Sequence, residues 1–153
     1  MDSIDRKEFA EALKYLFDET FAGSFEQGSV YLDSGVGIFH TIERLPADKA
    51  SKSIAGANVA AQTDHLRYYL DVLNNFLNGR VQFADWNNSW RIKEVTEEEW
   101  TEIRNKLQKS FETVQQTFAE KEEWNKDGLV EAMAMIVHSA YHLGAIRQLI
   151  KHL

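Results

Sequence analysis

Hydrophobic residues recur every three or four positions along most of this chain, which is the pattern of amphipathic α-helices. The clearest stripe follows Thr96-Glu97-Glu98-Glu99, a capping-box sequence with Thr at the cap and Glu three residues later. This stripe consists of Trp100, Ile103, Leu107, Phe111, Val114 and Phe118. We therefore predict a long helix that begins at Thr96 and extends beyond Phe118.

Three more long helices are predicted by the same pattern. The second in the chain can be capped by the Ser53 hydroxyl, and Asn78-Gly79 ends it. The last follows Asp127-Gly128 and covers about Leu129 to Lys151. The first ends near Gly23, and its apolar face consists of Phe9, Leu13, Leu16, Phe17 and Phe21.

A shorter helix is expected between the first two, because Leu32, Val36, Phe39 and Ile42 can share one face before Pro46. Four long helices in a chain of this length indicate an all-α protein, a helical bundle that forms a single domain over residues 1–153.

The segment of about 17 residues after Asn78 is too long for a simple turn between neighbouring helices. At about 3.3 Å per residue it can return along the bundle and let the second and third helices run in the same direction. An active-site loop is the competing explanation, and the two are compatible.

Composition and charge exclude several kinds of site. The 153 residues contain no cysteine, so disulfides, thiolate-bound metals and cysteine nucleophiles are excluded. The net charge of −7 argues against nucleic-acid binding, which depends on Lys and Arg at phosphates. Met1–Glu8 has no apolar stretch of the kind found in secretory signals. Glu131, His138 and Arg147 make a membrane span costly in the apolar last helix, so we expect a soluble, cytoplasmic protein.

Two histidines in the last predicted helix have the spacing of metal ligands. His138 and His142 stand four residues apart, so on a helix both imidazoles face the same way. Two imidazoles at this spacing can bind one ion from a rigid frame. The alternative is a chance pair of buried, hydrogen-bonded histidines.

A third histidine strengthens the case for a metal site. His65 is the midpoint of a helix over residues 53–77, and His138 and His142 flank the midpoint of a helix over residues 129–151. Helices of similar length that pack side by side bring their midpoints to one level, so the three imidazoles can meet inside the bundle. His40 and His152 are not included, because both are near the ends of their predicted segments.

Three imidazoles without a thiolate suit one divalent ion such as Zn²⁺ or Ni²⁺. Three protein ligands also leave positions for water or substrate, as in catalytic zinc sites. Polar residues at helical spacing from the histidines are candidates for orienting a ligand or substrate, although such residues are often simply solvated. These candidates are Asn58, Gln62, Tyr69 and Glu131.

These residues together resemble the DinB/YfiT-like superfamily. The resemblance rests on His65, on Asp85-Trp86-Asn-Asn-Ser89-Trp90, and on His138-Ser-Ala-Tyr-His142-Leu-Gly144-Ala-Ile-Arg147. It implies a four-helix bundle with an up-down-down-up course and one divalent metal, often nickel or zinc, bound by His65, His138 and His142. It also implies a homodimer. Ala145 stands where relatives often have glutamine, so this chain lacks that amide for a contact to a ligand or substrate.

The loop in this resemblance contains three more candidates with two interpretations each. Trp86 and Trp90 either pin the loop to the bundle or lie at the mouth of a substrate site. Asp85 either accepts a hydrogen bond from a ligand histidine or caps the turn that follows it.

Because relatives include thiol-dependent S-transferases, we expect a metal-dependent enzyme that acts on a small molecule by S-transfer or hydrolysis. A low-molecular-weight thiol is a candidate substrate. The alternatives are a dimeric binding or structural module whose metal only stabilises the fold, and a metal-free helical interaction protein.

Overall fold

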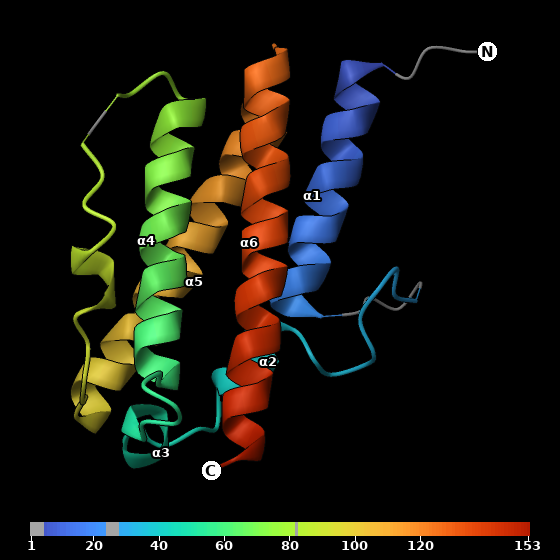
Figure 1. The fold of residues 1–153 in the computed structure, drawn as a ribbon. Coiled ribbons are helices and arrows are strands. Elements are labelled where there is room, and N and C mark those ends of the chain that lie inside the picture. Colours follow the sequence, from blue (N-terminus) through green and yellow to red (C-terminus); the bar gives the residue numbers. More distant parts are fainter. Residues whose placement is uncertain (1–4, 24–27, 82) are drawn as a thin grey trace.

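The computed structural model describes residues 5–23, 28–81 and 83–153, and within these ranges the chain is helical and has no strand (Figure 1). The prediction of an all-α protein is confirmed for this part of the chain. Residues 1–4, on which the expectation of no secretory signal partly rests, lie outside it. The long helices are α1 (Arg6–Ala22), α4 (Val59–Leu77), α5 (Glu97–Glu120) and α6 (Lys126–Lys151). The short ones are α2 (Ile38–Ile42), α3 (Ala47–Ser51) and the 3₁₀ turn η1 (Asn88–Trp90).

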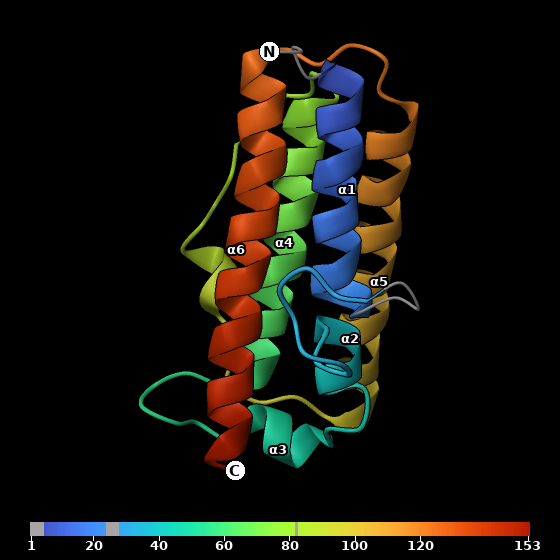
Figure 2. The ribbon, with the colours of Figure 1, turned by 90° about the vertical axis from the view of Figure 1, so that its right-hand side faces the viewer.

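The four long helices lie side by side (Figures 1 and 2). Helix α4 contacts both α5 and α6, and α1 contacts the same two helices from the other side. In Figure 1, α1 and α6 run downward, whereas α4 and α5 run upward. Helices α2 and α3 lie towards the lower end, where α4 begins and α6 ends.

Aromatic side chains fill much of the core between the long helices. Phe17 and Phe21 of α1 lie against Phe111 of α5, with ring centroids 5.3 and 5.0 Å apart. Trp100, at the start of α5, is fully buried, and its indole N–H donates to the Leu45 carbonyl oxygen at 2.7 Å. This bond satisfies the one polar atom of a large apolar side chain and joins α5 to the segment before α3.

The capping box at the start of α5 forms as predicted. The Thr96 hydroxyl accepts the backbone N–H of Glu99 at 3.2 Å, and the Glu99 carboxylate accepts that of Thr96 at 2.8 Å. The predicted end of α4 is also confirmed, since Asn78 follows its last residue and Gly79 has a left-handed backbone, with a φ of 71°. Local sequence signals determine both boundaries because each is stabilised by bonds between near neighbours.

The predicted start of α4 is wrong. Its N-cap is Asn58 rather than Ser53, and the Asn58 side-chain oxygen accepts the N–H of Ala61 at 2.7 Å. The residues just before it form a tight turn that is closed by backbone bonds between Ile54 and Ala57. Ala55 and Gly56 both have positive φ angles in this turn, which a helix does not allow.

Two other boundaries differ from the predictions. Helix α6 begins at Lys126, because the Asn125 side chain accepts the N–H of Gly128 and so includes this glycine in the first turn. The expected helix over residues 32–42 is reduced to α2. The residues before α2 are irregular because the buried Glu19 carboxylate accepts three consecutive backbone N–H groups, those of Val30, Tyr31 and Leu32. Helix α3, which follows Pro46, was not predicted.

The long segment between α4 and α5 passes down the outside of α4 to the start of α5 (Figure 1). Within it, η1 contacts α4 at mid-height. The segment therefore returns the chain to the level at which α4 began, as the length estimate allowed, and it also covers one side of α4.

Helix α6 has the length and composition of a membrane span, with a mean hydropathy of 1.3 over its most apolar window. It packs against α1 and α4, and core helices of soluble proteins meet the same criteria. This is therefore a weak membrane signal.

Candidate metal centre

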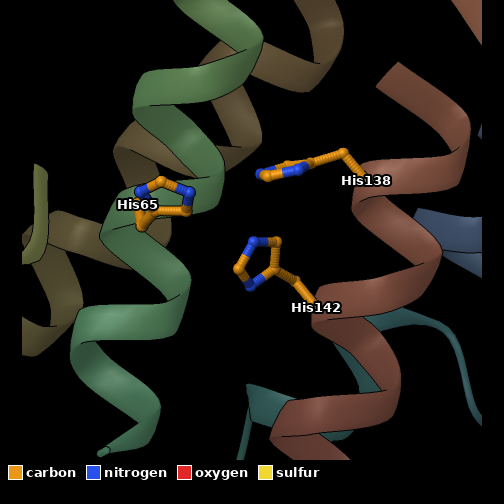
Figure 3. Close-up of side chains that lie close together, drawn as sticks. All are labelled: His65, His138 and His142. Carbon is orange, nitrogen blue, oxygen red and sulfur yellow. The ribbon is translucent and has the colours of Figure 1, made fainter. Parts of the chain in front are cut away.

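Three histidines from two neighbouring helices point toward one another in the space between α4 and α6 (Figure 3). His65 comes from α4, and His138 and His142 come from successive turns of α6. One ring nitrogen of each lies within 4.8 Å of the others. The ring centroids are 4.4 Å apart for the α6 pair and 5.0 and 5.3 Å apart for the pairs that include His65.

His65 is held on two sides by the segment that covers α4. Its Nδ1 lies 2.7 Å from the Ser89 hydroxyl oxygen, and its ring stacks on the Trp90 indole at a centroid distance of 3.9 Å. The Ser89 hydroxyl donates to the Trp86 carbonyl oxygen at 2.6 Å. Because this bond uses the hydroxyl proton, Ser89 accepts from His65, and the His65 proton is on Nδ1. The lone pair of His65 is therefore on Nε2.

His142 is held in the same way by α4. Its Nδ1 lies 2.5 Å from the Gln62 amide oxygen, which can only accept a hydrogen bond. The His142 proton is therefore also on Nδ1, and its lone pair is on Nε2. Both side chains are buried, so this hydrogen bond is shielded from water.

His138 is oriented by ring stacking. Tyr69 of α4 lies parallel to its imidazole, with ring centroids 3.6 Å apart and an interplanar angle of 15°. His138 is half-buried, and it is the most accessible of the three. The Nε2 atoms of His138 and His142 are both buried without a hydrogen-bond partner. Since a buried polar atom without a partner is costly, these two nitrogens are well placed to bind a metal ion.

The electrostatic environment keeps all three imidazoles neutral. Burial, together with the neighbouring His138 and His65, lowers the pKa of His142 to about 3. Burial and the nearby His65 likewise lower the pKa of His138 to about 4. Burial also lowers the pKa of His65, although Asp64 opposes this effect. Neutral imidazoles have the free lone pairs that a metal ion requires.

The geometry fits a single metal ion. Two nitrogens that both lie 2.0–2.1 Å from a tetrahedral ion are about 3.3 Å apart. The donor atoms lie within 4.8 Å of one another, so they need to approach by at most about 1.5 Å, which small side-chain rotations supply. The three-histidine group can thus hold a metal ion.

Two of the predicted orienting residues contact the histidines directly, namely Gln62 and Tyr69. Asn58 does not: its amide donates to the Ile92 and Lys93 carbonyl oxygens, so it ties the loop to the start of α4. Glu131 is two helical turns, about 10 Å, from His138, and it lies in a separate hollow with Lys121 and Asp127. Burial and Asp127 raise the Glu131 pKa there, while Lys121 opposes them.

The three candidates in the loop also differ in whether they contact a histidine of the cluster. Asp85 caps the turn, since its carboxylate accepts the Asn88 N–H at 3.1 Å; no bond from Asp85 to a histidine is found among the described residues. Trp86 lies edge-on against Tyr68 and tilted against Tyr69, so it pins the loop to α4. Trp90 stacks on His65 and also lines a neighbouring cavity.

Ser89 is the functional residue that sequence reasoning missed. It is buried and holds His65, yet a serine in a polar loop has no periodicity that would single it out. The one available signal was its position between two tryptophans in the segment that resembles the DinB/YfiT-like pattern.

Comparisons with protein-family models, with curated proteins and with solved structures find no match to this chain. What the histidine cluster does therefore has to follow from its own geometry.

Proposed function

We propose that this chain is a DinB/YfiT-like metal-dependent enzyme in which His65, His138 and His142 bind one Ni²⁺ or Zn²⁺ ion. The observation that carries the proposal is the pair of buried Nε2 atoms on His138 and His142, which lack a partner and face His65. Hydrogen bonds from the Nδ1 atoms of His65 and His142 support it, because they place the lone pair of each ring on Nε2.

A catalytic role is favoured over a structural one by the number of ligands. The group contains three histidines, and among the described residues no carboxylate joins them. Structural zinc sites usually have four protein ligands, whereas catalytic sites have three and leave a position for water or substrate. A bound divalent ion supplies Lewis acidity toward a substrate oxygen or sulfur. The protein positions the substrate at the accessible side of the cluster, near the half-buried His138.

The course of the helices supports the proposed family. The directions of α1, α4, α5 and α6 correspond to an up-down-down-up four-helix bundle, and the long segment after α4 makes the required return. Homodimerisation and a small-molecule substrate, such as a low-molecular-weight thiol, are part of the proposal. Because the chain contains no cysteine, the sulfur for any thiol chemistry has to come from the substrate.

The test is a screen of small thiols with electrophiles, and of hydrolysable esters and amides, on protein loaded with Ni²⁺ or Zn²⁺. We expect turnover that chelation abolishes and that His65→Ala removes. His40→Ala is the matched control, because His40 is an exposed histidine away from the cluster. Turnover that persists in His65→Ala would contradict the proposal.

One observation favours a second candidate, a dimeric binding module whose metal only stabilises the fold. Helix α6 has exposed apolar side chains at spacings of three and four, which form a stripe suited to a partner; they are Val130, Met133, Val137 and Tyr141. This candidate predicts a lower melting temperature after chelation, a fully coordinated ion and no turnover with any substrate.

A further inference from the structure

A cavity of about 1030 Å³ lies beside the histidine cluster, at the end of α4 where that helix begins. Its walls are α3, the first turn of α4 and the segment that leads into α5. The Trp90 indole belongs to both sites, because it stacks on His65 and also lines this cavity. Ala61, another wall residue, precedes His65 by one helical turn. The cavity wall therefore begins about 6 Å from His65 along the helix axis.

The side chains that line the cavity have a net positive charge, whereas the whole chain is negative. Three lysines line it, Lys49, Lys52 and Lys93, against two acidic residues, Asp48 and Glu94. The whole chain, in contrast, has a net charge of −7. The lining thus has one net positive charge next to a site made of neutral imidazoles.

Two of the lysines already converge on a single oxygen atom. The Lys49 and Lys52 ammonium groups donate to the Leu153 main-chain oxygen at 3.3 and 3.5 Å. Each ammonium group has three N–H donors, so each retains two for another acceptor. The long distances leave these side chains able to turn toward a stronger anionic acceptor in the cavity.

We propose that this cavity binds the carboxylate of the small molecule whose reactive end reaches the three histidines. This inference rests on the proposed function, because it extends the substrate site of that metal centre. The ammonium groups of Lys49, Lys52 and Lys93 are the donors that the lining offers to a carboxylate. The 40% exposed Trp90 offers the face of its indole that is turned away from His65 to the part of the ligand between its two ends.

The test uses two thiols of equal length on Co²⁺-loaded protein, 6-mercaptohexanoate and 6-mercapto-1-hexanol. Both bind through sulfur, and the thiolate-to-cobalt absorption band reports each dissociation constant. We expect the acid to bind about fivefold to tenfold more tightly, because partly exposed ion pairs each contribute up to about a fivefold effect. The preference should decrease as salt is raised.

Substitutions of lysines test which residues cause the preference for the acid. The pair Lys49→Ala and Lys52→Ala, made together, should remove the preference for the acid and leave the affinity for the alcohol unchanged. Lys109→Ala is the control, because it removes an exposed lysine from α5 outside this cavity. A shorter pair, 3-mercaptopropionate and 3-mercapto-1-propanol, should show no preference, because its chain does not span the helical turn to the cavity.

The outcomes separate the two proposals. Equal binding of the six-carbon acid and alcohol would overturn the carboxylate site and leave the metal centre standing. A preference that survives the double lysine substitution would also overturn it. A chain that takes up no Co²⁺ and gives no band with either thiol would overturn the proposed function, and this inference with it.

Discussion

Replacing Gln62 by leucine should weaken metal binding at the histidine cluster by about 10- to 100-fold, the usual cost of losing a residue that orients a metal ligand. Gln62 accepts the His142 Nδ1–H at 2.5 Å, and both side chains are buried. Leucine fills a similar volume and accepts no hydrogen bond. The His142 proton can then move to Nε2, which places the lone pair on the side away from His65 and His138.

The same substitution also has a cost in the metal-free protein. It leaves the His142 Nδ1 atom buried without a partner in either tautomer, which lowers the free energy of unfolding by about 1–3 kcal/mol. Gln62→Glu should behave differently, because a carboxylate accepts the same N–H and makes the imidazole more basic. We therefore expect Gln62→Glu to keep the metal affinity or to raise it.

The assay is Co²⁺ binding followed by visible absorption, with Zn²⁺ affinity measured by competition against a chelating dye. Gln115→Leu is the matched control, because the Gln115 amide donates to Asp18 at 2.8 Å on the far side of the molecule. It should lower the stability without changing the metal affinity. If Gln62→Leu binds metal as tightly as the unchanged protein, the argument from the His142 tautomer is refuted.

Three further predictions concern stability. In the metal-free protein the pKa values of His138 and His142 lie below the unfolded value of about 6.5, so the folded state binds fewer protons. The free energy of unfolding in urea should therefore fall as the pH is lowered from about 6.5 toward 4, and the double alanine variant of these histidines should show a smaller fall, since the pKa of His65 is lowered as well. Thr96→Ala should cost about 1 kcal/mol of unfolding free energy through loss of the capping box, and an unchanged urea midpoint would contradict this. Glu19→Gln should cost about 1.5–3 kcal/mol, because the buried carboxylate accepts three backbone N–H groups; a loss below 0.5 kcal/mol (about a third of the lower bound) would contradict it.

The long helices were predictable because their apolar stripes and their near-neighbour caps are local features. The start of α4 was not, since Ser53 and Asn58 are both good N-caps and the choice depends on the turn between them. This error affects the argument about helix midpoints. The observed α4 has its midpoint near residue 68, so His65 lies below it. His65 and His142 still lie at the same height in the bundle. Helix α6 runs in the opposite direction to α4, and His142 lies below the midpoint of α6 by a similar amount.

At the candidate site, too, the residues on helices were predictable from local spacing, whereas the residue in the irregular segment was not. The spacing of His138 and His142 placed them on one face, and Gln62 and Tyr69 were within reach of the cluster because they share a helix face with His65. Ser89 lies in an irregular segment whose path across α4 depends on tertiary contacts. Its contact with His65 therefore required the fold to be known.

The most direct test of the central claim is the metal content of protein purified without an affinity tag, measured by elemental analysis. We expect about one divalent ion per chain, with nickel or zinc the main element, and near-zero metal in His138→Ala under the same purification. Near-zero metal in both proteins, even after incubation with Zn²⁺ or Ni²⁺, would contradict it. An equal metal content in both would contradict it as well.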